Sequence, residues 1–223
     1  PAMFQTGGKA LAYVHEDAPR ERTVYELLVG AFLTAGQRSN STARVFVHTK
    51  AWDDVVPDLV RRAQRLRVGY GLDEDVFMGP LISDTLRTRF RKYCRALVSK
   101  GHVALCEGDA IELSGHRGHY AAPGIYEVRW RGGLPFLNEE PPGPLLLVYR
   151  VESIDEAVDL HNRAVYRPVT SLFTRVDGPA LPELRDRLRT GAINVNRSTI
   201  GASLRLPTSP QGRSGMGLPG GME

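Results

Sequence analysis

The sequence predicts an α/β domain whose mainly parallel sheet is flanked by helices. Short apolar segments of strand length alternate along the chain with amphipathic segments of helical period. Residues 145–151 form a nearly continuous apolar run, which is typical of a parallel strand buried on both faces. With 223 residues, of which 42% are hydrophobic, the chain can build one substantial core, although length alone would allow one or two domains.

Three strands and three helices are expected in the first half of the chain. Pro19 suits the start of the first helix, because its fixed φ matches the first helical turn. Glycines at 68–71 are expected to end the second helix in the left-handed conformation, and Ser83 or Asp84 can cap the third. In chain order, the expected elements are a strand at 9–14, a helix ending at 32, a strand at 44–48, helices at 52–66 and 84–99, and a strand at 102–105.

The second half is expected to continue this alternation after a surface segment. Residues 107–120 are polar, contain Gly and His and show no period, so we interpret them as a surface hairpin or loop. A Pro-rich approach at 134–144 precedes the apolar strand at 145–151. The other expected elements are strands at 123–128, 170–174 and 192–196, helices at 154–162 and 181–189, and a Gly-rich tail at 212–221.

The formal net charge of +4 raises the question of a polyanionic partner. The arginines lie in helices beside acidic residues, as at 58–62 and 183–189, which is typical of solvated helix faces. We therefore expect no nucleic-acid partner. No apolar run is long enough to cross a membrane and no signal peptide is present at the start, so we expect a cytoplasmic location without membrane contact. Cys94 and Cys106, on a predicted helix and a predicted strand, require no disulfide.

Residues 34–44 read as a helix end, a tight glycine turn and the start of a buried strand. Such a turn can hold a small polar side chain, here Ser39, out towards a cleft. This stretch resembles the segment around the nucleophile of the aldehyde dehydrogenase family, where a G-Q-R-C-type turn presents the catalytic cysteine. Ser39 stands at the position of that cysteine.

Other segments resemble motifs of the same family and occur in the family's order. They are Gln5-Thr6-Gly7-Gly8-Lys9 for E-[LM]-G-G-[KN], 140–144 for E-x-F-G-P with Pro142 in place of Phe, Asn194-Val195-Asn196 for N-x-N, and 212–215 for G-x-S-G. Within the family, residues 32–38 and 196–202 are most similar to succinylglutamate semialdehyde dehydrogenases.

The resemblance implies one domain over residues 1–223, equivalent to the family's catalytic domain, with the nucleotide-binding domain absent. In the family a cysteine thiolate attacks the aldehyde, the resulting thiohemiacetal gives a hydride to NAD, and a glutamate activates water. By the resemblance, Ser39 occupies the nucleophile position and Gln5 the position of the base. Glu140 matches the glutamate that holds the nicotinamide ribose.

Both reactive groups are therefore replaced by groups of low reactivity. A hydroxyl is far less ionised than a thiol and needs an adjacent base. The Gln5 amide cannot accept a proton, and a positioned general base contributes typically ~10²–10⁴ in rate. We expect a non-catalytic interaction or stabilising module without a cofactor, in which Ser39, Gln5 and Glu140 are vestigial. Surfaces that the family buries between domains predict a protein partner or self-association.

Several alternatives remain open from the sequence. The chain could be the catalytic half of a truncated or split NAD(P)-dependent semialdehyde dehydrogenase, with NAD as its cofactor. Ser39 and Gln5 also match a deliberate inactivation, although Pro142 and the missing nucleotide domain favour natural degeneration. Ser39 could serve as an esterase nucleophile if a histidine and an acid converged on it, and His15 and His48 are the nearest histidines in sequence.

The remaining polar and sulfur-containing candidates are expected to be structural. His116 and His119 lie in a Gly-containing loop without a third ligand nearby, so no metal site is expected. Cys106 is expected to be a core residue rather than a displaced nucleophile. Asn194 and Asn196 are interpreted as structural residues at a strand end.

Overall fold

The computed structural model describes residues 4–129, 136, 138–201 and 209–216. A seven-stranded sheet of order β11-β10-β2-β3-β8-β7-β4 forms its centre, and every neighbouring pair is parallel except β4 with β7. The strands are β2 (Ala10–Val14), β3 (Thr42–His48), β4 (Val103–Cys106), β7 (Gly124–Glu127), β8 (Leu145–Val151), β10 (Thr170–Phe173) and β11 (Ile193–Val195). The predicted α/β architecture with a mainly parallel sheet is confirmed.

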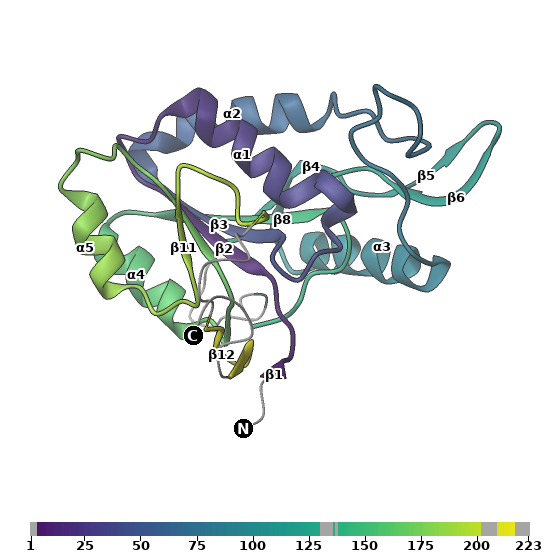
Figure 1. Cartoon of the computed structure of the whole chain (residues 1–223). Coiled ribbons are helices and arrows are strands. Elements are labelled where there is room, and N and C mark those ends of the chain that lie inside the picture. The colour runs from purple at the N-terminus through teal and green to yellow at the C-terminus, as the bar shows by residue number, and fades with distance from the viewer. Residues whose placement is uncertain (1–3, 130–135, 137, 202–208, 217–223) are drawn as a thin grey trace.

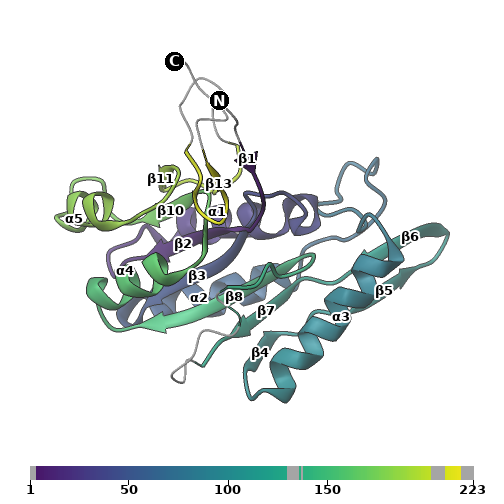
Figure 2. The same ribbon diagram turned by 90° about the horizontal axis from the view of Figure 1, so that it is seen from below.

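Helices cover both faces of this sheet (Figure 1, Figure 2). On one face, α1 (Arg20–Phe32) and α2 (Thr49–Ala63) pack against each other and against β3. On the other face, α3 (Asp84–Ser99) contacts β4, and α4 (Ile154–Arg163) contacts β8 and α5 (Ala180–Arg187). Because both faces are covered, the strands read as apolar runs rather than as alternating patterns.

The core lies between the sheet and these two helical layers. Every position of β2 and β3 is buried, and the rings of Phe32, Phe46 and Phe90 are fully enclosed. Removal of apolar surface from water is the main driving force of folding. The two central strands are therefore held firmly, and so are the segments that lead into them.

The predicted bounds are confirmed for α3 and are wrong for α2. The Ser83 hydroxyl accepts a hydrogen bond from the Leu86 amide at 3.2 Å, so Ser83 is the N-cap and the predicted span 84–99 is confirmed. The predicted span of the second helix is wrong at both ends, since α2 begins at Thr49 and ends at Ala63. Its C-cap, Gln64, has φ −63° and ψ −21°, so no left-handed glycine ends this helix.

The surface segment at 107–120 contains a hairpin of β5 (Ala110–Leu113) and β6 (His116–Ala121), which projects from the body of the molecule (Figure 1). This result confirms the hairpin interpretation. Two short antiparallel ladders were not predicted: β1 (Phe4–Gln5) with β13 (Gly215–Met216), and β9 (Tyr166–Arg167) with β12 (Gln211–Gly212). The predicted Pro-rich approach and Gly-rich tail lie partly outside the described residues.

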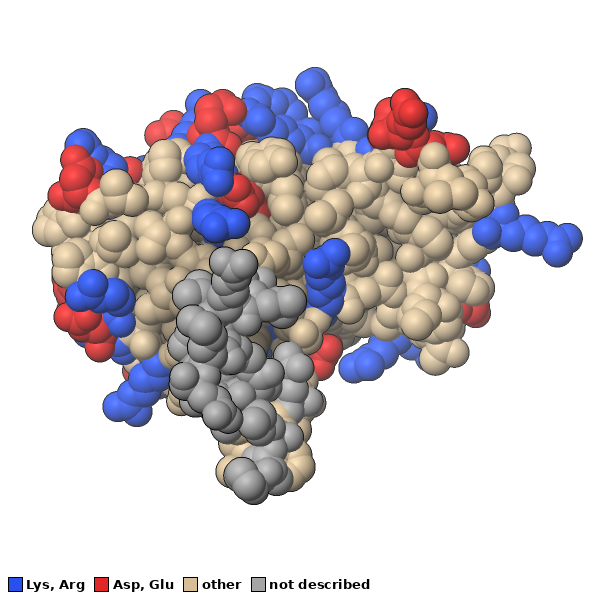
Figure 3. All heavy atoms as spheres, in the orientation of Figure 1, with Lys and Arg blue, Asp and Glu red and all other residues tan. Residues whose placement is uncertain are grey.

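Lysine, arginine and acidic side chains are interspersed on the face shown in Figure 3. Arg62 pairs with Asp58 at 3.1 Å, and Arg187 pairs with Glu183 at 2.5 Å. The arginines of these two helical segments are therefore balanced by acids, as predicted. Among the described residues, no helix has the length and apolar character needed to cross a membrane.

Candidate functional site

Residues 5–9, 34–41 and 140–144 meet at one edge of the sheet. They precede the neighbouring strands β2, β3 and β8, whose amino ends lie side by side because the strands are parallel. The Ala10 amide donates to the Ser41 carbonyl at 2.9 Å, and the Gly8 amide donates to the Glu140 carboxylate at 3.2 Å. The structure thus brings together the three segments that carry Gln5, Ser39 and Glu140.

The turn between α1 and β3 has an uncommon backbone. It passes through the 3₁₀ segment η1 (Leu33–Gly36), where Thr34, Ala35 and Gly36 have φ of 64°, 52° and 62°. Left-handed backbone at non-glycine residues is costly and tends to persist at functional sites. A Cβ atom at Gly36 would lie 2.3 Å from the Gly143 carbonyl oxygen. The turn therefore packs its backbone directly against the 140–144 segment.

The Gln37 side chain ties this turn to the segment before α3. Its Oε1 accepts from the Ile82 amide at 2.8 Å, while its Nε2 donates to the carbonyls of Thr34 at 3.2 Å and Pro80 at 3.3 Å. An amide can donate and accept at the same time, whereas a carboxylate at this position could only accept. Gln37 therefore joins the turn to residues 80–82.

Ser39 lies in the last turn before β3, and its side chain is exposed. The Ser41 amide donates to the Arg38 carbonyl at 3.0 Å, and the Arg38 amide donates to the Ser41 hydroxyl at 3.1 Å, which fixes the backbone around it. Within the described part of the chain, no residue forms a hydrogen bond with the Ser39 hydroxyl. No histidine or carboxylate there is in position to remove its proton.

The two histidines nearest to Ser39 in sequence lie at the opposite edge of the sheet. His48 ends β3 and His15 follows β2, whereas Ser39 precedes β3. Seven strand residues, roughly 20 Å of extended chain, separate the two ends of β3. The structure therefore does not bring His15 or His48 to Ser39, as the esterase alternative would require, because β3 separates them from it.

Gln5 is placed through its backbone. It lies in β1 opposite Gly215, and the following amide, that of Thr6, donates to the Ser214 carbonyl at 3.1 Å. Gly7 and Gly8 come next with φ of 141° and 83°, which only glycine adopts readily. The chain therefore turns sharply between Gln5 and the start of β2.

A cavity of about 220 Å³ lies where the three segments meet, and it contains the one buried amine of this edge. Lys9 is only 4% exposed, and its Nζ donates to the Gly143 carbonyl at 3.1 Å. Burial lowers the pKa of Lys9 from 10.5 to about 7, and the positive charges of Arg44 and Arg89 act in the same direction, against the carboxylate of Glu140. The wall includes Gln37, Leu86, Arg89, Glu140 and Pro142.

Sequence reasoning missed Lys9 as a functional residue and treated it only as the last letter of a motif. The available signal was a lysine placed directly between two glycines and an apolar strand, where no solvent-exposed position is expected. Ser39 belongs to the turn but does not line this cavity, whereas Gly36 and Gln37 of the same turn do. Glu140 does line it, so the structure places the predicted cofactor-binding carboxylate at the cavity.

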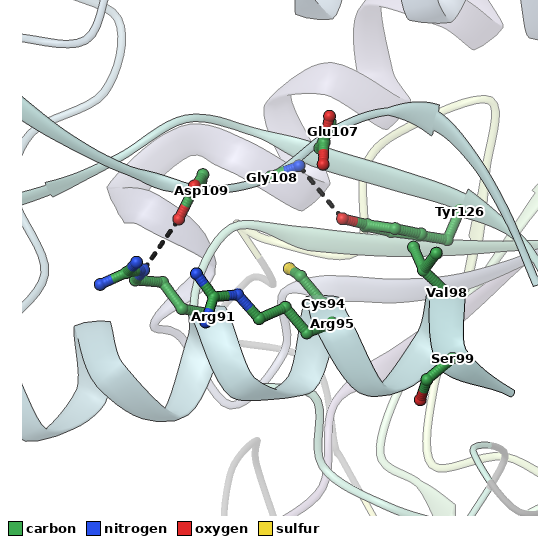
Figure 4. Close-up of a pocket in the computed structure, with 9 residues that line it drawn as sticks. All are labelled: Arg91, Cys94, Arg95, Val98, Ser99, Glu107, Gly108, Asp109 and Tyr126. Carbon is green, nitrogen blue, oxygen red and sulfur yellow. Dashed lines mark hydrogen bonds and ion pairs between the residues drawn. The ribbon is translucent and has the colours of Figure 1, made fainter.

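A second hollow, of about 270 Å³, lies between α3, the segment 107–109 that follows β4, and Tyr126 of β7 (Figure 4). Cys94 points into it from α3, and the Tyr126 hydroxyl accepts from the Gly108 amide at 3.2 Å. Burial raises the pKa of the Cys94 thiol to about 12, and burial also raises the pKa of Cys106. Neither thiol is therefore an effective nucleophile near neutral pH.

Cys106, Asn194 and Asn196 have structural roles. Cys106 is 7% exposed and its Sγ donates to the Pro123 carbonyl at 3.3 Å, which confirms the predicted core position. At the end of β11, the side-chain amides of Asn194 and Asn196 donate to the carbonyls of Ser198 and Thr174, each at 2.8 Å, so their structural role is confirmed.

The side chains of His116 and His119, on the β5–β6 hairpin, contact residues outside the three site segments. His116 stacks on Tyr70 with ring centroids 5.2 Å apart, and His119 has its Nδ1 3.9 Å from the Asp84 carboxylate. Over residues 4–129, 136, 138–201 and 209–216, no three His, Cys, Asp or Glu side chains are grouped so that they could hold a metal ion.

Comparison with known proteins finds relatives along nearly the whole chain. The sequence model of the aldehyde dehydrogenase family matches residues 1–223. The alpha-ketoglutaric semialdehyde dehydrogenase of Bacillus subtilis is 28% identical over 206 residues, which are 92% of this chain and 42% of that protein. The chain therefore spans less than half the length of this relative.

Solved structures show the same fold. Lactaldehyde dehydrogenase from Escherichia coli superimposes with a TM-score of 0.88 and 26% identity, over 98% of this chain and 45% of that one. An aldehyde dehydrogenase from Bacillus cereus, solved in complex with NAD+, superimposes with a TM-score of 0.86 and 24% identity, over 97% of this chain and 43% of that one.

Proposed function

The chain belongs to the aldehyde dehydrogenase family, and we propose that it is a non-catalytic member domain, which keeps the fold for interaction or stabilisation and uses no cofactor. The observation that carries this proposal is Ser39. The turn before β3 is fully formed, yet it presents a hydroxyl where the family's motif presents a thiol. No described residue hydrogen-bonds to that hydroxyl, and an unassisted hydroxyl attacks carbonyl carbons slowly.

Gln5 supports the same proposal from a second position. By the motif, it stands where the family has the glutamate that activates water. An amide has no basic lone pair comparable to that of a carboxylate, so hydrolysis of any covalent intermediate would lose typically ~10²–10⁴ in rate. Glu140 alone keeps the residue type of its motif position, and one carboxylate is a weak anchor for a dinucleotide.

A second candidate function is the catalytic half of an NAD(P)-dependent semialdehyde dehydrogenase. It is favoured by the extent of the match, because this chain aligns with 42% of a semialdehyde dehydrogenase and could be completed by a nucleotide-binding unit. In this reading residues 1–223 form one domain equivalent to the family's catalytic domain, Glu140 contacts the cofactor, and NAD binds only in the completed protein.

The deciding experiment compares the chain with Ser39→Cys, Gln5→Glu and the double variant. We expect no NADH from α-ketoglutaric semialdehyde and no heat on titration with millimolar NAD for the unaltered chain. The thiol introduced in Ser39→Cys should react with iodoacetamide at least about tenfold faster than Cys94 and Cys106, because those two are buried and protonated.

The results of this experiment distinguish a non-catalytic domain from the catalytic half of a dehydrogenase. NADH formation by the unaltered chain, or saturable micromolar NAD binding, would overturn the non-catalytic proposal and favour the dehydrogenase. A fast thiol in Ser39→Cys without NADH in any variant would mean that the turn still presents position 39 to solvent but that the chain is not a dehydrogenase by itself. A slow thiol there would contradict the site assignment of Ser39.

A further inference from the structure

The Lys9 amine is a nucleophile that the proposed function does not use. It sits at the inner wall of the cavity between residues 5–9, 34–41 and 140–144, with its Nζ held by the Gly143 carbonyl at 3.1 Å. The side chain is 4% exposed, so the amine is reached through the cavity rather than from bulk water. Lysines desolvated in this way are the ones that serve as Schiff-base nucleophiles in proteins.

Burial favours the neutral form of Lys9. It is the main cause of the lowered pKa of about 7, which the Glu140 carboxylate opposes and the positive charges of Arg44 and Arg89 reinforce. At pH 8 roughly nine-tenths of such amines carry a free lone pair, against well under a hundredth for an exposed lysine of ordinary pKa. A large share of Lys9 is therefore in the neutral, nucleophilic form at pH 7–8.

The cavity is also lined by a positively charged side chain, Arg89, which suits an acidic substrate. Arg89 lines its wall from α3 and is exposed, and among the described residues no carboxylate forms an ion pair with it. The wall also includes the apolar side chains of Leu86, Pro141 and Pro142, and the Glu140 carboxylate, which accepts from the Gly8 amide at 3.2 Å. An amine, a short apolar wall and a guanidinium suit a small aldehyde that carries a carboxylate at its other end.

We propose that Lys9 captures small carboxylated aldehydes covalently, as an imine, while Arg89 binds the carboxylate. The lone pair of Nζ attacks the carbonyl carbon, the C=O π pair moves to the oxygen, and one proton passes from nitrogen to that oxygen to give a carbinolamine. Loss of this hydroxyl as water, with a second proton from nitrogen, forms the C=N bond. The step needs no oxidant, and it requires neither Ser39, Gln5 nor NAD.

The test uses the whole chain, 4-oxobutanoate as probe and cyanoborohydride at pH 7 to reduce any imine to a stable secondary amine. Peptide mass spectrometry then reads each lysine separately, and the chain contains only Lys9, Lys50, Lys92 and Lys100. We expect the adduct at Lys9 to form at least about tenfold faster than at Lys92 or Lys100, because Lys9 lines the cavity and burial lowers its pKa to about 7. The rate at Lys9 should level off above about pH 8.

Imine formation at Lys9 and carboxylate binding by Arg89 can be tested separately. Arg89→Ala should raise the half-saturating concentration of 4-oxobutanoate about tenfold and leave that of butanal unchanged, whereas the neighbouring Thr88→Ala should change neither. A Lys9 adduct that forms no faster than those at Lys92 and Lys100 would overturn the capture. Equal effects of Arg89→Ala on both aldehydes would overturn the role of Arg89. Both results are independent of NADH formation, so they are distinguishable from a failure of the non-catalytic proposal.

Discussion

At the scale of single residues, Gly36 carries the strictest requirement in the site. Its φ of 62° lies in the left-handed region, and an added Cβ would meet the Gly143 carbonyl at 2.3 Å and the Ala31 carbonyl at 3.0 Å. These atoms, and the Gly143 carbonyl carbon at 3.0 Å, belong to the backbone, which cannot rotate aside as a side chain can. The geometry of the whole turn therefore depends on a residue that has no chemical role.

We expect Gly36→Ala to lower the free energy of unfolding by about 2–4 kcal/mol, from left-handed strain and the displaced backbone together. Urea unfolding followed by circular dichroism measures it. Gly71→Ala is the matched control, because Gly71 has no positive φ and nothing within 4 Å of its added Cβ. It should change stability by less than about 0.5 kcal/mol. Equal losses in the two variants would contradict the packing of the turn on residues 140–144.

Lys9 shows why the candidate site could be predicted only in part. The motif letters placed Ser39, Gln5 and Glu140 in segments that do meet, because each segment leads into a neighbouring parallel strand. The burial of Lys9 depends on a residue 134 positions away, since its partner is the Gly143 carbonyl. A local sequence pattern has no access to such contacts, and so the most perturbed amine of the site was not recognised.

At the scale of elements, α4 is joined to β10 through a buried histidine. His161 is 2% exposed, and its Nε2 lies 2.7 Å from the Thr170 hydroxyl, which in turn donates to Thr190 at 2.9 Å. Burial lowers the pKa of His161 from 6.5 to about 4. The folded chain thus holds this imidazole neutral, while the unfolded chain protonates it near pH 6.5.

The sign of the resulting pH dependence follows from this lowered pKa. The contribution of His161 is fully present above pH 6.5 and is lost as the pH falls from 6.5 towards 4, because the unfolded state then binds one more proton. The loss of folding stability that comes from His161 is about 2 kcal/mol between pH 7 and pH 5. We expect His161→Asn to reduce the loss of stability over this interval by that amount, measured by urea unfolding at both pH values.

The matched control is His116→Asn, the same substitution at an exposed histidine of the β5–β6 hairpin. Each variant is compared with itself at two pH values, so a general destabilisation of His161→Asn does not affect the result. The same loss in the wild type and in His161→Asn would contradict the buried neutral histidine.

The helices and strands that could be predicted are those with a signal in their own residues. α3 and β8 matched their predicted spans because each carries its own signal, a serine cap at Ser83 and an apolar run at 145–151. α2 was misjudged because glycines at 68–71 were read as its end, although these residues instead pair with the segment before α3, as in the bridge of Val68 with Met78. The two-residue ladders of β1 and β9 carry no local signal, because their partners come from residues 211–216.

At the scale of the whole molecule, the site edge of the sheet exposes several large apolar side chains. Ile82, at the wall of the Lys9 cavity, is 84% exposed, and Phe4 and Met216, opposite each other in the β1–β13 ladder, are 51% and 60% exposed. Large apolar side chains left in water near a functional site indicate a surface that another protein covers. The non-catalytic proposal needs such a surface, and self-association is its simplest form.

We therefore expect the chain to self-associate through this edge, and Ile82→Lys to raise the dissociation constant roughly 10–100-fold, since burying an isoleucine contributes about 1.5–3 kcal/mol. Sedimentation velocity over a range of concentrations measures it. Val176→Lys is the control, because Val176 is 70% exposed and follows β10 at the opposite edge. Equal weakening by both substitutions would mean that added charge, rather than this edge, governs association. A wild-type chain that stays monomeric at every concentration would exclude self-association and leave Ile82 as a contact for a different protein.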